Sequence, residues 1–141
     1  MSEFKFKIPY SVRIADINYG GHVSNAAVMN FFHDARIAYL KHFEASELDI
    51  GGVGIIMPEA HVRYHREMFL GDDLQIAVRI DSMRKSSMIM MYQILRGDEI
   101  AVEGSTNIVA FDYDRRKSVR IPKPFRQKVS DYEGRQDWIE W

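Results

Sequence analysis

The chain of 141 residues contains no cysteine. Disulfides, thiolate catalysis and cysteine-ligated zinc are therefore excluded together, while the redox compartment stays undetermined. An excess of one charge is also lacking, because 19 basic residues stand against 20 acidic ones and the net charge is −1. A dedicated nucleic-acid binder usually carries a basic excess on one face, so we expect no nucleic-acid partner.

Long hydrophobic runs are missing as well. No stretch approaches the roughly 18 apolar residues of a membrane span. The first ten residues, MSEFKFKIPY, alternate Phe with Lys and lack the apolar core of a signal peptide. We therefore expect no membrane partner and a cytoplasmic location. The near-zero net charge causes little self-repulsion and is compatible with oligomers.

The length and composition predict one folded domain. A domain usually has roughly 100–200 residues, and hydrophobic residues make up 46% of this chain, which is enough for a core without metals or disulfides. No repeat, low-complexity segment or Pro-rich linker divides the sequence. We expect a single domain over residues 1–141, in which the polar segment from about residue 124 forms either a short docking helix or a loose tail.

The hydrophobic pattern predicts one long helix among strands. Apolar residues at helical spacing predict a helix from Asn25 to about Phe43, apolar enough to be buried against a sheet. The predicted strands cover residues 4–14, 55–68 with an interruption near Pro58, 74–80, 88–96 and 100–112, with a short strand before Pro122. The segments between consecutive predicted strands are short, which indicates antiparallel pairing, because parallel strands need long crossovers. One helix on one antiparallel sheet of about five strands is an α+β architecture.

Residues 16–25, which read DINYGGHVSN, lead directly into the predicted helix. The simpler interpretation is a turn and a helix cap. Gly20 and Gly21 would supply unusual backbone angles, and Ser24 or Asn25 would cap the helix.

The same residues also suit an active site. Free N–H groups and a partial positive charge at a helix N-terminus can hold a developing oxyanion. The N–H of Asn25 or of its neighbour is then the candidate donor, with Asp16, Asn18 and His22 around the reacting group. A histidine in a capped turn more often bonds the backbone, but its usual pKa of about 6.5 leaves acid–base work open.

The pattern R-x-x-D-x-N-x-x-G-H-V-x-N, from Arg13 to Asn25, resembles the signature of hot-dog-fold acyl-CoA thioesterases. In the 4-hydroxybenzoyl-CoA thioesterase-like branch the signature reads D-x-D-x-x-G-[HIV]-V, and the helix continues to [DE]-A-R, matched here by residues 34–36. LGDD at 70–73 resembles the family's [FL]-G-D turn. The likeness covers residues from about 8 to 125.

The resemblance implies one long helix wrapped by a curved antiparallel sheet, in agreement with the hydrophobic pattern. It implies hydrolysis of an acyl-CoA or acyl-carrier thioester to a free acid and CoA, without a metal or redox cofactor. Active sites in this fold lie between subunits, so a homodimer or homotetramer is also implied.

A further turn, Arg84-Lys85-Ser86, resembles an R-[RK]-S turn that lies near the CoA phosphates in this family. Arg and Lys pair with phosphate oxygens and Ser donates a hydrogen bond. The plainer interpretation is a solvated hairpin turn. Gly20 and Gly21 would complete the substrate-binding set by letting the substrate approach the backbone.

The sequence departs from the family at the catalytic carboxylate. The second Asp of D-x-D is replaced by Asn18, and an amide cannot act as a general base at neutral pH. Asp16 is one candidate for that role, and Asp34 is the other because related hot-dog enzymes place an acid on this helix. Asn18 would then orient a water molecule or the thioester carbonyl.

Two other functions stay open. A hot-dog domain that binds acyl-CoA or another apolar ligand without turnover would explain Asn18. A hot-dog dehydratase or hydratase would use an Asp and His pair in a loop pattern that we do not find here. His61 and His65 would share one face of a strand, but the sequence offers no third ligand for a metal site.

Overall fold

A computed structural model describes residues 3–140 of the chain. Its elements are β1 (Phe6–Ser11), a 3-10 turn (Ile14–Asp16), α1 (Asn25–His42), β2 (Gly54–Tyr64), β3 (Asp73–Met83), β4 (Ser87–Arg96), β5 (Glu99–Asp112), β6 (Lys117–Ser118), α2 (Lys123–Glu133) and a second 3-10 turn (Gln136–Glu140). The predicted order of one strand, one long helix and consecutive strands is confirmed. The first two predicted strands are shorter than expected, because β1 ends at Ser11 and β2 at Tyr64.

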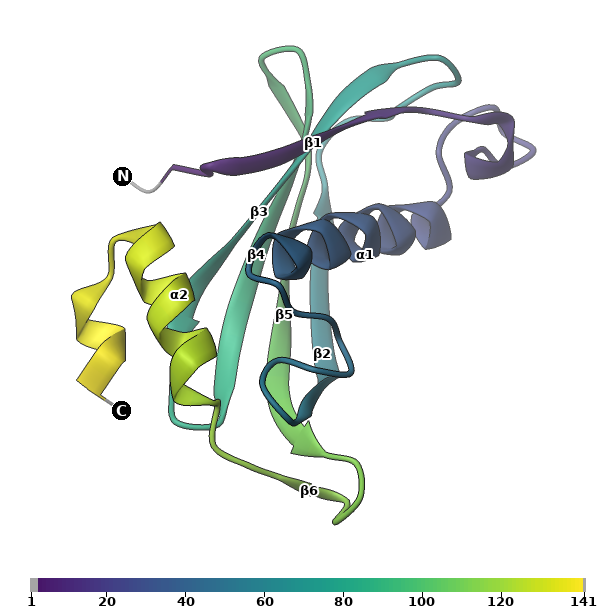
Figure 1. Cartoon of the computed structure of the whole chain (residues 1–141). Coiled ribbons are helices and arrows are strands. Elements are labelled where there is room, and N and C mark those ends of the chain that lie inside the picture. Colours follow the sequence, from purple (N-terminus) through teal and green to yellow (C-terminus); the bar gives the residue numbers. More distant parts are fainter. Residues whose placement is uncertain (1–2, 141) are drawn as a thin grey trace.

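The strands form one antiparallel sheet in the order β1-β3-β4-β5-β2, and β6 pairs with the end of β5. Helix α1 lies across one face of this sheet (Figure 1). Five strands therefore make up the main sheet, and the sixth has two residues. This is the predicted α+β hot-dog architecture.

Helix α1 begins after Ser24, whose Oγ accepts the Ala27 N–H at 3.1 Å, so Ser24 is the cap. The buried face of the helix includes Ala27, Val28, Phe31, Phe32, Ala35, Tyr39 and Leu40. The ring of Phe32 stacks on Tyr92 of β4 with 4.5 Å between centroids. Ile37, an apolar residue of the helix that was expected to be buried against the sheet, is 46% exposed.

Strand β2 continues past Pro58. Its register against β5 shifts between Ile56 and Glu59, so a bulge takes up the residue that has no N–H to donate. The interruption expected at Pro58 is therefore a bulge. Strand β2 is also an edge of the sheet, because within residues 3–140 it pairs only with β5, and proline is tolerated at such edges.

The C-terminal segment contains α2, which follows β6 along the chain (Figure 1). Phe125 and Val129 are buried in the core. Arg126 is 2% exposed and donates from Nη2 to the backbone oxygens of Arg84 and Lys85, at 2.5 and 3.2 Å. Within residues 3–140, no helix combines the length and apolar character needed to cross a membrane.

Candidate active site

The loop before α1 is paired with the segment that follows β2. The Val23 N–H donates to the Met68 carbonyl at 2.8 Å, and His22 forms a bridge with Phe69. Residues 17 and 23 also pair across the loop. The start of α1 is therefore held against residues about 45 positions later in the chain.

Asn18 is part of the turn. Its Oδ1 accepts the Gly20 N–H at 2.9 Å, and its carbonyl accepts the Gly21 N–H at 3.0 Å. Gly21 has φ +86°, in the region that favours glycine. A Cβ on Gly20 would lie 3.2 Å from Asn18 Oδ1 and 3.4 Å from His22 Nε2, so a larger residue would have little room here.

The first two N–H groups of α1 are free. The Ala27 N–H donates to Ser24 Oγ. The N–H groups of Asn25 and Ala26 have no hydrogen-bond acceptor in the described part of the chain. Intrahelical bonding leaves such groups without partners at every helix start. Together with the helix dipole, they form a site suited to a negatively charged oxygen.

A cavity of about 210 Å³ opens at this helix start, lined by His22, Val23, Asn25, Val28, Tyr64, His65, Arg66, Glu67 and Met68. Val23, Val28 and Met68 are buried and give it an apolar floor. The Tyr64 hydroxyl donates to the Asn25 carbonyl at 3.5 Å. The volume of this cavity is below the roughly 300–1,000 Å³ of ordinary ligand pockets.

Asp16 does not line the cavity. Its Oδ2 accepts the Tyr10 hydroxyl at 2.6 Å and the Arg13 N–H at 2.9 Å. Burial, and then the hydrogen bond to Asp16, raise the pKa of Tyr10 to about 12, so Tyr10 remains a donor at neutral pH. In this arrangement Asp16 holds the 3-10 turn together.

Asp34 is exposed on α1, nine residues after Asn25. A rise of 1.5 Å per residue places it roughly 13 Å along the axis from the first free N–H. Its short side chain cannot cover that distance, so within one chain Asp34 does not reach the helix start. Its role as a base stays a prediction that would require a second subunit.

The helix ending that matched the family motif has a structural explanation. Arg36 is 6% exposed, and it donates from Nε to Glu47 Oε2 at 2.8 Å and from Nη1 to the Tyr92 hydroxyl at 3.0 Å. Partial burial alone would raise the pKa of Glu47, but hydrogen bonds from Arg36 and His33 outweigh it and lower that pKa. This network ties the middle of α1 to β4.

Glu67 is a site residue that the sequence did not reveal. Its Oε1 lies 3.6 Å from His22 Nε2, and both side chains are partly open to solvent, at 64% and 39%. The residue stands in a segment that the pattern assigned to a strand. No local spacing marks it, because its place beside His22 depends on the long-range pairing of Val23 with Met68.

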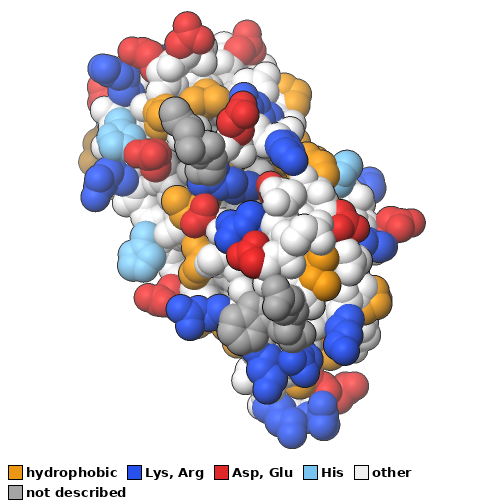
Figure 2. Space-filling model, turned by 90° about the vertical axis from the view of Figure 1, so that its left-hand side faces the viewer, with side chains coloured by type: hydrophobic (Ala, Val, Ile, Leu, Met, Phe, Trp, Pro, Cys, Tyr) orange, Lys and Arg blue, Asp and Glu red, His pale blue; other side chains and the backbone are white. Residues whose placement is uncertain are grey.

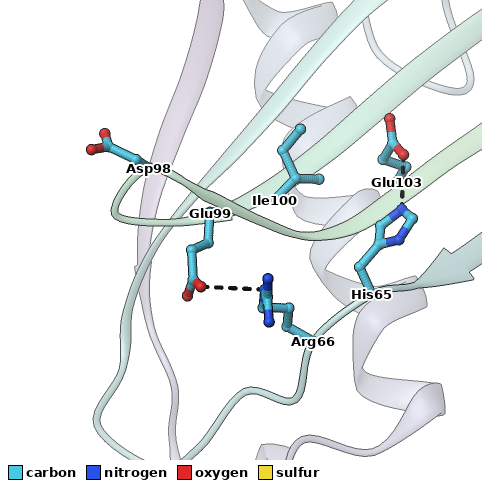
Figure 3. Close-up of a pocket in the computed structure, with 6 residues that line it drawn as sticks. All are labelled: His65, Arg66, Asp98, Glu99, Ile100 and Glu103. Carbon is cyan, nitrogen blue, oxygen red and sulfur yellow. Dashed lines mark hydrogen bonds and ion pairs between the residues drawn. The ribbon is translucent and has the colours of Figure 1, made fainter.

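A larger hollow of about 630 Å³ lies between the end of β2 and the turn from β4 to β5 (Figure 3). Here His65 Nε2 lies 2.8 Å from Glu103 Oε1, and Arg66 Nε lies 3.2 Å from Glu99 Oε2. His65 and Arg66 line both hollows, so the two adjoin, but Glu103 does not line the cavity at the helix start.

The two histidines that suggested a metal pair have different partners. His61 Nε2 lies 3.5 Å from Glu59 Oε2, whereas His65 is bonded to Glu103. Among residues 3–140, no three His, Cys, Asp or Glu side chains are grouped as metal ligands.

The Arg84-Lys85-Ser86 turn joins β3 to β4, as predicted. Strand β3 begins next to the loop before α1, where the Val12 N–H donates to the Asp72 carbonyl. Its 11 residues span roughly 35 Å, so within one chain the turn and the helix start lie at opposite ends of the sheet. Lys and Arg side chains gather at the lower end of Figure 2, where Figure 1 places this turn and β6.

The fold and the free helix start define a hot-dog domain with a polar site at the N-terminus of its central helix. A family model described as the Thioesterase-like superfamily matches residues 12–129, and the chain belongs to this superfamily. The acyl-CoA thioester hydrolase YbgC of Escherichia coli O6:H1 is 28% identical over 126 residues, which cover 87% of this chain and 94% of that protein.

The fold is also similar to solved structures of thioesterases. A thioesterase from Thermus thermophilus, crystallised with coenzyme A and Zn, superposes with a TM-score of 0.85 at 27% identity, covering 96% of this chain and 98% of that one. A thioesterase superfamily protein from Jannaschia sp. CCS1 gives a TM-score of 0.82 at 26% identity, covering 95% and 86%.

Proposed function

We propose that this chain hydrolyses an acyl-CoA thioester to a free acid and CoA. The observation that carries the proposal is the cavity at the start of α1, which has an apolar floor and is lined by Asn25, the first of two helix residues whose N–H groups are free. Family membership and the thioester hydrolase activity named for YbgC support the same reaction.

In this mechanism the thioester carbonyl oxygen points at the helix start. Water attacks the carbonyl carbon, and the negative charge that develops on oxygen is held by the two free N–H groups and the helix dipole. The C–S bond then breaks and CoA leaves as a thiolate. Asn18 shapes the turn that carries Gly20 and Gly21, and it does not contact the reacting group.

We further propose that the active unit is a homodimer built on β2. An edge strand of 11 residues presents unpaired backbone groups that a second copy can satisfy. Antiparallel pairing of β2 with its copy would place the start of one β2 beside the end of the other. The partner subunit's Arg84 and Lys85 would then approach this chain's helix start, which supports the predicted CoA-phosphate contact.

The proposed function is tested with a panel of acyl-CoA thioesters and a thiol-reactive dye that reports free CoA. We expect turnover of at least one member. Thermal stabilisation by a thioester that is never turned over would instead show a binding domain, the alternative that Asn18 suggests.

Reversing the charge of the basic turn should weaken binding of CoA esters. With Arg84→Glu or Lys85→Glu, we expect KM to rise about tenfold, or about 1.4 kcal/mol, with little change in kcat, because a phosphate contact is lost. The control is a thioester of N-acetylcysteamine, which has no phosphates and should show no change. An equal rise in KM for both substrates would contradict the assignment.

A further inference from the structure

Glu67 occupies a position that suits the missing base. It is the only carboxylate among the described residues that line the cavity at the start of α1. Asp16 and Asn18 lie outside that lining, and Asp34 is more than two helical turns away. From this we propose that Glu67 is the general base of the thioesterase, with His22 as its positioning residue; the inference rests on the proposed function.

The backbone around Glu67 is fixed on both sides. Its carbonyl accepts Arg96 Nη1 at 2.8 Å, and the carbonyl of the next residue, Met68, accepts the Val23 N–H at 2.8 Å. The second bond joins Met68, the residue after Glu67, to the loop that ends at the helix start. This pairing therefore holds Glu67 and Asn25, which has a free N–H, on the same cavity, and such fixed placement favours catalysis.

His22 is the cavity residue that can orient this carboxylate. Its Nε2 lies 3.6 Å from Glu67 Oε1, within ion-pair range. Glu67 is 64% exposed in the chain, so a water molecule can reach it.

The proposed step is a general-base attack by water. Glu67 takes a proton from water while the water oxygen bonds to the thioester carbon, and the carbonyl electron pair moves onto oxygen at the helix start. Collapse of this intermediate breaks the C–S bond and releases the thiolate and the acid. The proton on Glu67 passes to the thiolate, which restores the carboxylate and yields CoA.

The test is the change Glu67→Gln, which keeps size and polarity. Loss of a general base usually costs about 10²–10⁴ in rate, so we expect kcat to fall at least about 100-fold with KM within a few-fold and an unchanged Tm. Glu67→Asp should retain an intermediate kcat, since it keeps the carboxylate on a shorter stem. His22→Gln should lower kcat less than Glu67→Gln, also without raising KM.

Glu103→Gln is the matched control, because Glu103 is bonded to a neighbouring histidine, His65, but does not itself line this cavity, and the change should leave kcat unchanged. If wild-type enzyme turns over and Glu67→Gln keeps its kcat, or only raises KM, the inference is overturned while the proposed function stands. If the wild type turns over no thioester of the panel, both are overturned.

Discussion

Asn25→Pro is expected to lower kcat about 100-fold, because it removes one free N–H from the helix start, and loss of one oxyanion donor typically costs about 10²–10³. The fold should tolerate the change. Proline is favoured at the first position of a helix, and Ser24 before it is extended, with φ −75° and ψ 155°, as a residue preceding proline prefers. The Asn25 N–H has no acceptor to lose among the described residues.

Asn25→Ala is the control for this experiment, since it removes the same side chain but keeps the N–H. We expect its kcat to stay within a few-fold of the wild type. Circular dichroism and Tm should be close to wild type for both variants. A proline variant with normal kcat and normal Tm would show that the Asn25 N–H does not stabilise the transition state.

Gly104→Ala should destabilise the fold by about 3 kcal/mol, at the upper end for overpacking a core. A Cβ at this position of β5 would overlap Phe32 Cε2 and lie 2.6 Å from Phe32 Cζ. Phe32 is fully buried, and its ring is stacked on Tyr92, so it cannot move aside. The glycine lets α1 approach the sheet. Chemical denaturation with measurement of the free energy of unfolding checks this value.

Two further variants separate the steric effect from other causes. Phe32→Leu should be destabilising alone, but Gly104→Ala added to it should cost clearly less than in the wild type, because the clashing ring atoms are gone. Ser105→Ala, one residue further along β5, should be nearly neutral. If the losses in free energy of unfolding from the two substitutions simply add in the double variant, the proposed clash between a Cβ at position 104 and the Phe32 ring is contradicted.

Much of the fold could be predicted from the sequence. The helical spacing from Val28 to Tyr39 and the alternation in 74–80 are local signals, and both elements form where expected. The bulge at Pro58 depends on the pairing of β2 with β5. The exposure of Ile37 depends on which elements pack against that side of the helix. Local periodicity carries no information about such neighbours.

The candidate site was predicted in part. The free N–H group of Asn25 and the turn around Gly20 and Gly21 follow from local chemistry and form as expected. Of these residues only Asn25 lines the cavity at the helix start, and Gly20 and Gly21 lie outside its lining. Glu67 could not be found in this way, because the backbone pairing of Val23 with Met68 brings it to the site. Conversely, the sequence alone could not show that Asp16 is held by Tyr10.

The most direct test of the account compares the wild type with Asn18→Asp on the same acyl-CoA thioesters. Asn18 Oδ1 accepts a backbone N–H from Gly20, a bond that an Asp carboxylate would also accept, so the turn should be kept. Since Asn18 does not line the cavity, we predict turnover by the wild type and a kcat/KM within a few-fold of it for Asn18→Asp. Turnover that occurs only in Asn18→Asp would contradict the claim that this chain is a thioesterase with Asn18 in place.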